Sequence, residues 1–446
     1  MNLDWLIFGL AVLTAVNYWF RRSVVYPPFL FCGMWLLDTL IYRIGLSDLY
    51  SLHTITCYVV FAGAVVFSLG GALGFLVPHG LLARRITVFG NPKTSGKWIV
   101  RVILILLVIG LINNVRNAIS VAGGITTANG VFWAAAAKVS VDELNANGGS
   151  VQVGNYISNW AIFMAVLLLS ERYSRLGLVV AGLAFVSGIV SGGRGALFLL
   201  VSALITIYLI KTKRESLSAA RRSVQIPVIS FVALFIVLFF VNKGVQTNGE
   251  SVFVMARDVM MQYIVGGMAA LDYVLVHMGD YQHLPNHTFQ LFLKVASSFG
   301  VISYTPPPPL DEWVFIPFGT NVYTIYKPYI VDFGIYAGVG WMCLIGFAHT
   351  VLFRKAHTNS ILGRYIFALT VYSVFMVIFD DEYSRFGMYG SALLLGVFYL
   401  MVRSIPGRIF RPATVEAQSS GRRFPKVRWL RPVPMLRLRL RQRRSE

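Results

Sequence analysis

The sequence predicts an all-α polytopic integral membrane protein with about 11 transmembrane helices, in a range of about 10–12. Its 446 residues are 56% hydrophobic and only 13% charged, and its mean hydropathy is +0.67. These values differ from those of soluble domains. Apolar runs of roughly 17 to 27 residues recur along the chain, and about 20 residues cross a hydrocarbon core. Basic residues gather beside the ends of these runs.

Each long apolar run is assigned one span. We expect spans at about 4–20, 25–42, 52–78, 98–120, 155–170, 176–190, 196–210, 225–242, 329–353, 364–380 and 386–403. The second run is unusual for a span because it contains Pro27, Pro28 and Asp38.

The distribution of charge predicts the orientation of these spans. With the N-terminus outside, the segments on the inner side hold 29 of the 39 Lys and Arg residues but only 4 of the 19 acidic residues. Such a bias is typical of cytoplasmic loops. The C-terminus is therefore expected in the cytoplasm. The inner segments are 20–23, 79–97, 171–175, 211–224, 354–364 and 403–446.

The chain is expected to consist of a membrane domain, residues 1–403, and a basic tail, residues 404–446. Although the net charge is +20, the tail directly follows the last span, which favours anchoring to anionic membrane lipids over binding nucleic acid. We expect the tail to be disordered. The membrane domain should have two long outer loops, about 121–154 and 243–328. Within the second, residues 256–275 are expected to form a helix lying on or dipping into the membrane surface.

Arg194 is the only charged residue between Leu176 and Ile210. These residues predict a helical hairpin whose turn is SGGRG, residues 191–195, on the outer side. Glycines permit a tight turn with exposed backbone amides, and the helix that starts at about Ala196 directs its N-terminal end to the same place. An arginine there is suited to hold an anion such as a phosphate. The alternative is an arginine that extends to lipid headgroups.

Other cations are expected on the same outer face, where the charge bias disfavours them. Lys243 and Arg257 lie in the second long outer loop, and Arg385 lies in DDEYSRFG at an outer span end. Arg116 stands in an asparagine-rich segment near the outer end of the fourth span, where polar side chains should face the protein interior or a cavity.

Two further patterns look like metal-binding motifs, but the residues that normally accompany such motifs are missing. Asp332-Phe333-Gly334 matches the metal-binding triplet of protein kinases, yet it opens a span and no other kinase motif accompanies it. His277, His283 and His287 are close in sequence, but Pro285 interrupts the helix that would align the last two. We expect no metal and no cofactor.

The stretch GTNVYTIYKPYIVDFGIYAGVGWMCLIG, residues 319–346, resembles the signature of the Wzy-type O-antigen polymerases, the bacterial polysaccharide repeat-unit polymerases. SGGRG (191–195) and QYIVGGMAALDYVL (262–275) are also similar to family segments. The resemblance covers about residues 180–350.

The resemblance implies a lipid-carrier glycosyltransferase of GT-C-like architecture in the bacterial inner membrane, with its active site facing the periplasm. It would transfer a glycan from one undecaprenyl pyrophosphate to the sugar of a second lipid-linked repeat unit. Metal independence would follow if arginines stabilise the leaving pyrophosphate. Membrane lipids and a chain-length regulator protein are the other expected partners.

The implied site combines cations, a base and sugar-binding side chains. Arg194 and Arg257 would hold the pyrophosphates, with Arg385 or Arg116 in support, and Asp258 or Asp332 would be the base. Lys243 is a further candidate for binding substrate. For Asp332 the alternative is an N-cap of its helix. Aromatic and hydroxyl groups suit a sugar, although tyrosines also form interfacial belts. The side chains expected to bind substrate are Tyr263, Asn321, Tyr323, Thr324 and Tyr326.

Two other functions remain open at this stage. An O-antigen ligase, which transfers finished polymer to the lipid A core, would need the same arginines. A flippase or transporter would instead place ionisable residues through the span centres and often shows inverted repeats. Neither feature is evident in this sequence, so the polymerase is the expected function.

Overall fold

The computed structural model describes most of the chain. It covers residues 1–45, 50–83, 104–105, 107–112, 148–171, 175–190, 194–226, 228–229, 265–277, 285–305, 313–316, 319–358, 360–383 and 386–404. Residues Met1–Ile405 form one compact unit; a second unit, Pro406–Glu446, lies outside the described residues.

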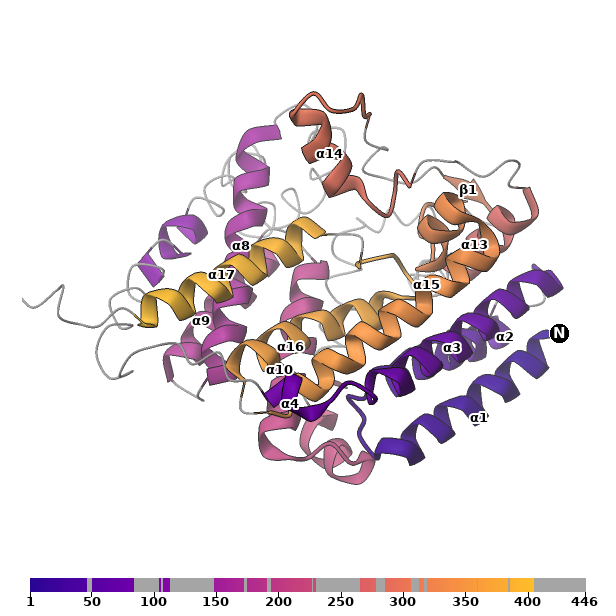
Figure 1. Cartoon of the computed structure of the whole chain (residues 1–446), viewed down its shortest axis with the longest axis horizontal. Helices are drawn as coiled ribbons and strands as arrows, with labels where there is room; N and C mark the ends of the chain where they lie inside the picture. The colour runs from indigo at the N-terminus through magenta and orange to yellow at the C-terminus, as the bar shows by residue number, and fades with distance from the viewer. Residues whose placement is uncertain are drawn as a thin grey trace, which may run out of the picture. The chain divides into compact units, whose positions relative to one another are not determined.

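The described residues are almost entirely helical (Figure 1). The first helices are α1 (Leu3–Arg21), α2 (Pro27–Gly45), α3 (Thr54–Gly74) and α4 (His79–Ala83). The middle of the chain contributes α8 (Gly148–Glu171), α9 (Arg175–Val190), α10 (Arg194–Thr212), α13 (Gly266–His277) and α14 (Gln290–Ser298). The last helices are α15 (Tyr326–Ala356), α16 (Ile361–Met376) and α17 (Phe386–Ser404). A short antiparallel pair, β1 (Val314–Phe315) and β2 (Gly319–Thr320), precedes α15.

The described helices support a helical membrane protein. Four of them are long and apolar enough to cross a membrane by length and composition: Leu3–Arg21, Thr54–Gly74, Gly195–Thr212 and Tyr326–Ala356. Helices also overlap the expected spans at 25–42, 155–170, 176–190, 364–380 and 386–403. The expected spans 98–120 and 225–242 fall mainly outside the described residues. The total of about 11 spans therefore stays a prediction.

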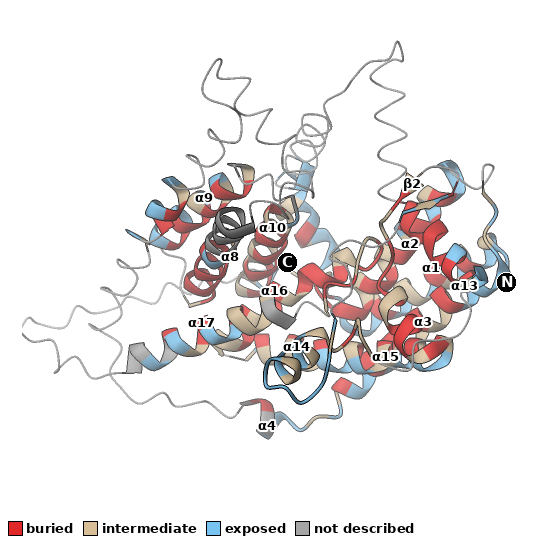
Figure 2. Cartoon of the chain, turned by 90° about the horizontal axis from the view of Figure 1, so that it is seen from above, coloured by how far each residue is buried: buried red, intermediate tan, exposed pale blue. Residues whose placement is uncertain are grey.

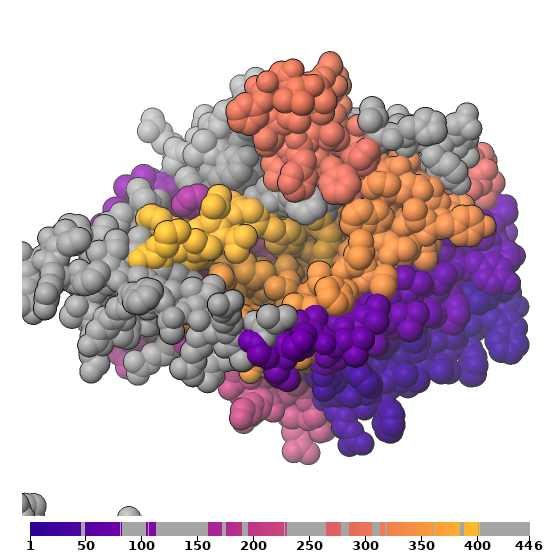
Figure 3. Space-filling view, viewed as in Figure 1, coloured from indigo at the N-terminus to yellow at the C-terminus, as the bar shows by residue number. Residues whose placement is uncertain are grey.

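Helices α3 and α15 lie side by side in extensive contact (Figure 3), and they pack through glycines. A Cβ on Gly70 would overlap the carbonyl oxygen of Cys343, and one on Gly346 would overlap that of Phe67. Apolar helices in a bilayer gain contact area when small residues let their backbones approach. These glycines therefore set the distance between the two helices.

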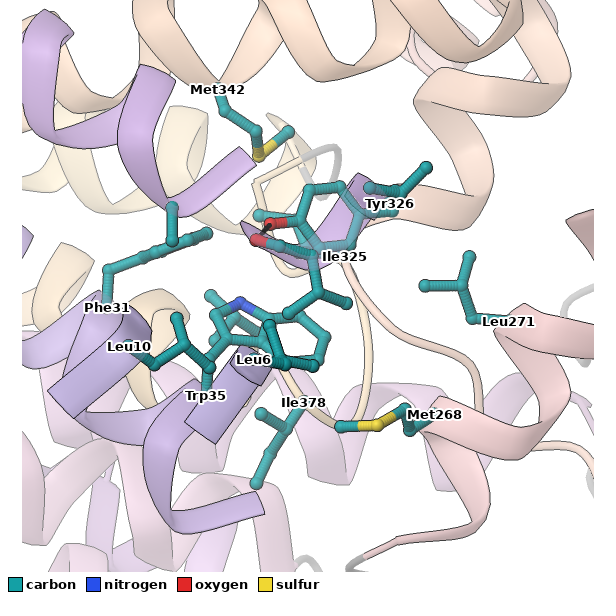
Figure 4. Close-up of a cluster of buried hydrophobic side chains, with 14 of the residues drawn as sticks. Leu6, Leu10, Phe31, Trp35, Met268, Leu271, Ile325, Tyr326, Met342 and Ile378 are labelled. Carbon is teal, nitrogen blue, oxygen red and sulfur yellow. Dashed lines mark hydrogen bonds between the residues drawn. The ribbon is translucent and has the colours of Figure 1, made fainter. Parts of the chain in front are cut away.

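A large buried cluster lies where α1, α2, α3, α13 and α15 meet (Figure 4). Trp35 of α2 and Tyr326 of α15 are fully buried, with ring centroids 5.3 Å apart. Phe31 stacks on Phe67 at 4.0 Å. Figure 2 shows that buried residues follow the facing sides of these helices.

The helix ends that the sequence places on the inner side contact one another. The Glu215 carboxylate accepts a hydrogen bond from Ser23 Oγ at 2.5 Å and lies 2.8 Å from His357 Nε2. Arg354 donates to the carbonyl oxygens of Gly74 and Val77, both at 2.7 Å, at the end of α3. Cations stabilise helix C-termini through the helix dipole. The inner-side arginine thus joins the ends of α3 and α15.

The helix expected at 256–275 on the membrane surface is in part buried inside the protein. Its described part, α13, is buried from Gly266 to Asp272 and packs against α3, α15 and β2. Met268 and Leu271 point into the main core (Figure 4). The prediction of a membrane-surface helix is therefore wrong for this part, because its small and apolar residues pack inside the protein. By contrast, no residue of α14 is buried.

Candidate functional site

The expected site residues fall into two groups. Arg194, Asn321, Tyr323, Thr324, Tyr326 and Asp332 belong to described elements, although nothing is described for the Arg194 side chain. The remaining candidates lie outside the described residues: Arg116, Lys243, Arg257, Asp258, Tyr263 and Arg385.

Arg194 is the first residue of α10, close to the expected helix start. Its neighbour Gly195 faces Tyr372 near the end of α16, where an added Cβ would stand 3.0 Å from the tyrosine hydroxyl. That hydroxyl donates to Glu382 Oε1 at 3.1 Å. The start of α10 therefore lies beside the DDEY segment, residues 380–383.

The DDEY segment also contacts α15. Tyr329 in the first turns of α15 donates to Asp381 Oδ1 at 3.3 Å, and Asp381 and Glu382 are both buried. The Ile325 N–H, just before α15, donates to Val377 O at 2.9 Å. Thus α10, the end of α16 and the start of α15 meet at the end that the sequence places outside.

The Asn-Val-Tyr-Thr element, residues 321–324, lies against α13. Thr324 is 1% exposed and its Cγ2 would be 3.5 Å from a Cβ on Gly267. Tyr323 packs on Val274, and the Lys327 ammonium stands 3.5 Å above the Tyr323 ring. A cation over an aromatic face is attracted by the ring's negative π surface. Asn321 is partly exposed.

Tyr326 has a structural role instead of the expected substrate contact. It is fully buried, and its hydroxyl donates to Val60 O at 3.3 Å. A Cβ on Gly63 would overlap the tyrosine ring, so α3 makes room for it there. No surface of Tyr326 is left for a sugar.

Asp332 also has a structural role. It is 5% exposed, and its Oδ2 accepts the backbone N–H groups of Thr288 at 2.6 Å and His287 at 3.1 Å. Asp332 therefore acts neither as the expected base nor as the N-cap of its own helix. Its carboxylate instead holds the backbone of the loop at His287 and Thr288. Burial, together with the charge of Asp332, raises the pKa of nearby Tyr304.

The loop held by Asp332 packs on a bend in α15. Phe289 lies 6.3 Å from Phe333 and 5.9 Å from Trp341 between ring centroids. Gly334 has φ 79° and ψ 169°, which breaks the helix at this point. Glycine adopts such backbone angles without the steric cost that a Cβ adds. The Asp-Phe-Gly triplet therefore turns the chain and anchors the loop.

A hydrogen-bonded cluster around one buried carboxylate, which the sequence does not predict, lies at the start of α3. Asp272 of α13 is completely buried. Its Oδ1 accepts the His53 N–H at 2.8 Å and the Thr56 hydroxyl at 2.5 Å. Its Oδ2 accepts the Tyr50 hydroxyl at 2.8 Å and lies 2.8 Å from His53 Nδ1. Burial, and then the hydrogen bond and charge of Asp272, raise the pKa of Tyr50.

The sequence contained one signal for this cluster. Asp272 is an acidic residue in an otherwise apolar part of QYIVGGMAALDYVL, and such a residue needs partners when it is buried. Its partners are more than 200 positions away along the chain, so the sequence could not name them. Among the described residues, no group of three His, Cys, Asp or Glu side chains is arranged to hold a metal ion.

Comparison of the chain with protein-family models, curated proteins and solved structures found no match. The chemical character of the site therefore rests on its own residues. The candidate site lies at one end of an apolar helical protein, where α10 begins at Arg194. It contains the buried carboxyl groups of Asp272, Asp381 and Glu382 and partly exposed polar groups such as Asn321.

Proposed function

We propose that the protein polymerises undecaprenyl-pyrophosphate-linked oligosaccharide repeat units into O-antigen or a similar surface polysaccharide. The observation that carries the proposal is the convergence of three segments. The start of α10 reaches the DDEY segment through Tyr372, that segment reaches α15 through Tyr329, and residues 321–324 pack on α13. These segments contain the three stretches of the sequence that resemble the polymerase family.

The substrates explain why such a site belongs at a helix end. A lipid-linked glycan keeps its polyprenyl chain in the bilayer, its pyrophosphate at the surface and its sugars in water. Negative charge grows on the pyrophosphate as the glycosidic phosphate bond breaks, and positioned cations lower the barrier. Arg194 and Arg257 fill this role in the proposal, with Arg385, Arg116 and Lys243 in support. Tyr263 and Asn321 bind the sugars in the proposal, and the buried Tyr323 and Thr324 hold the Asn321 segment against α13.

The proposal includes the membrane arrangement. The protein is a GT-C-like glycosyltransferase of about 11 spans in the bacterial inner membrane, with its site facing the periplasm and its basic tail in the cytoplasm. The mutual contacts of the inner-side segments support the alternation of the spans. A chain-length regulator protein is a candidate partner.

Deletion of the gene tests the function directly. The lipopolysaccharide of a polymerase mutant carries a single repeat unit on its core, whereas that of a ligase mutant carries none. A flippase mutant also lacks repeat units but retains them on the inner side of the membrane. An unchanged ladder in the deletion strain would exclude all three functions.

Arg194→Ala tests the site. We expect normal protein levels in the membrane but no long polymer, because a cation at the leaving group is lost. Arg43→Ala is the matched control, since Arg43 lies at a predicted outer helix end and pairs with Asp4 at 3.2 Å, with both side chains more than half exposed. Exposed ion pairs contribute about 0–1 kcal/mol. Normal chain lengths in the Arg194→Ala strain would overturn the assignment.

A further inference from the structure

We infer that His53 is the general base of the proposed transfer and that Asp272 positions it. The inference rests on the proposed function and adds a residue that the resemblance did not supply. Its basis is the contact between an exposed imidazole and a completely buried carboxylate at the end of the molecule where the site residues converge.

The hydrogen bonds around Asp272 determine the histidine tautomer. Thr56 and Tyr50 donate hydroxyl protons to the carboxylate, and His53 donates its backbone N–H. Each carboxylate oxygen already accepts at least one bond, and neither can donate to Nδ1 while the carboxylate is ionised. Therefore Nδ1 carries the proton and donates it to Oδ2 at 2.8 Å. In the neutral ring, Nε2 then carries the lone pair.

The exposed side of the imidazole is the reactive side. The His53 side chain is 56% exposed, whereas that of Asp272 is 0% exposed. The structure describes no hydrogen-bond partner for Nε2 among the residues it covers. A base oriented through its other nitrogen by a buried carboxylate is the arrangement that activates hydroxyl groups in many enzymes.

The N-terminus of α3 leaves the His53 side chain without a capping role. His53 is the N-cap residue of α3, yet its side chain makes no capping hydrogen bond. Asp272 lies at this N-terminus and accepts the His53 N–H and the Thr56 hydroxyl, and its charge is favoured there by the helix dipole. The imidazole is thereby turned to Asp272 and away from the helix.

The same helix connects the dyad to the proposed sugar side. Asp272 belongs to α13, and Val274, two residues later, packs on Tyr323. Gly267 in the first turn of α13 is next to Thr324. Helix α13 therefore contacts both the His53–Asp272 pair and residues 321–324.

In the proposed step, the hydroxyl of the acceptor sugar displaces undecaprenyl pyrophosphate from the donor sugar. Nε2 takes the proton of the acceptor sugar hydroxyl while its oxygen forms a bond to the anomeric carbon of the donor. The bond from that carbon to the pyrophosphate oxygen breaks, and its electron pair leaves with undecaprenyl pyrophosphate. His53 then holds the proton, and Asp272 stabilises the resulting imidazolium. The proton later returns to water or to the leaving group.

The experiment measures polymer growth in membranes that contain the full-length protein. The substrate is the lipid-linked repeat unit extracted from the deletion strain, and chain length is followed on gels over time. We expect His53→Ala to lower the rate by about 10²–10⁴-fold, the range typical of a lost general base. The limb of the pH–rate profile where imidazoles titrate should disappear, and added imidazole should restore part of the rate.

Two further variants make the result decisive. His53→Asn keeps an N–H toward Asp272 but has no basic nitrogen, so it should be inactive at normal protein levels even if His53→Ala folds poorly. His277→Ala is the matched control, because His277 is an exposed histidine on α13 whose Nδ1 lies 3.0 Å from Tyr273 O of the same helix. This variant should keep the wild-type rate.

The outcomes separate the two proposals. If wild-type membranes fail to lengthen the repeat units, the proposed function falls. If they succeed but His53→Asn polymerises within about twofold of wild type, the base assignment falls and the function stands. The base assignment also falls if His53→Ala is slow, its remaining rate depends on pH as the wild-type rate does, and added imidazole does not raise that rate.

Discussion

Tyr372 donates a hydrogen bond to Glu382 at 3.1 Å while its hydroxyl lies against Gly195, the residue after Arg194. One side chain thus joins the start of α10 to the segment that leads into α17. Because the tyrosine and the glutamate are both buried, this link is shielded from water. It defines the position of the Arg194 backbone relative to α16.

Tyr372→Phe removes this link and keeps the ring. We expect a loss of about 1.5–3 kcal/mol, the usual contribution of a hydrogen bond to a charged group, and shorter polymer at normal protein levels. Thermal melting in detergent and the lipopolysaccharide ladder measure the two effects. Tyr18→Phe is the control, since the Tyr18 hydroxyl accepts the Leu217 N–H at the opposite, inner end of the helices. A normal ladder in Tyr372→Phe would contradict the role of the link in positioning Arg194.

The contact between His357 and Glu215 makes stability depend on pH. Burial lowers the pKa of His357, but the hydrogen bond and charge of Glu215 outweigh burial, so the pKa is raised overall. A raised pKa means that the folded protein binds the proton more tightly than the unfolded chain. The stabilisation is complete below about pH 6.5, the ordinary histidine value, and it is lost as pH rises through the raised pKa.

We therefore expect the melting temperature of His357→Gln to differ most from wild type at about pH 6 and to approach it at higher pH. Melting of both proteins in detergent across this range gives the comparison. A difference that grows as pH rises would show that the histidine acts in its neutral form.

The glycine contacts between α3 and α15 predict contrasting effects of alanine. Gly70→Ala would place a methyl group on the Cys343 carbonyl oxygen, which forces the helices apart. Overpacking of this kind costs about 1–3 kcal/mol. Gly340→Ala on the same α15 meets nothing within 4 Å and should be tolerated. Protein levels in the membrane and melting temperatures would distinguish the two. Equal behaviour would mean that α3 and α15 shift easily.

Thiol labelling tests the predicted orientation. Ser51 lies before α3 and Lys213 follows α10, and both are exposed. A membrane-impermeant thiol reagent should label Ser51→Cys in intact spheroplasts, but Lys213→Cys only after the membrane is opened. Cys32 and Cys57 are buried, and the partly exposed Cys343 is replaced by Ala in the parent protein so that the background stays low. The reverse pattern would place the candidate site in the cytoplasm.

Much of the helical fold could be predicted because apolar runs and flanking charges are local properties of the sequence. The run 176–210, for example, predicts two helices joined at 191–195; in the structure α9 ends at Val190 and α10 begins at Arg194. Charge counting alone predicts which arginines and lysines lie on the inner side of the membrane. Their use as partners of helix ends, as in Arg354 with Gly74 O, depends on packing.

The candidate site was predictable only in part because its geometry depends on contacts between distant segments. Tyr326 and Asp332 have the residue types of a sugar site and a base, yet burial assigns one to the core and the other to a loop anchor. The glycines of α15 also differ in ways that the sequence does not reveal. A Cβ on Gly338 would stand 2.9 Å from Ile330 N in the first part of the same helix, across the bend, whereas Gly340 has open space. His53 gave no signal because its partner is 219 positions away.

The backbone angles of Gly334 divide α15 into a short outer part and a long part that crosses the apolar region. Because the two parts meet at a single residue, the torsions of that residue set the tilt of one part relative to the other. The short part carries Tyr329 and Asp332, whose hydrogen bonds reach Asp381 and the backbone of Thr288. Its direction is therefore set by these two contacts and not by the axis of the long part.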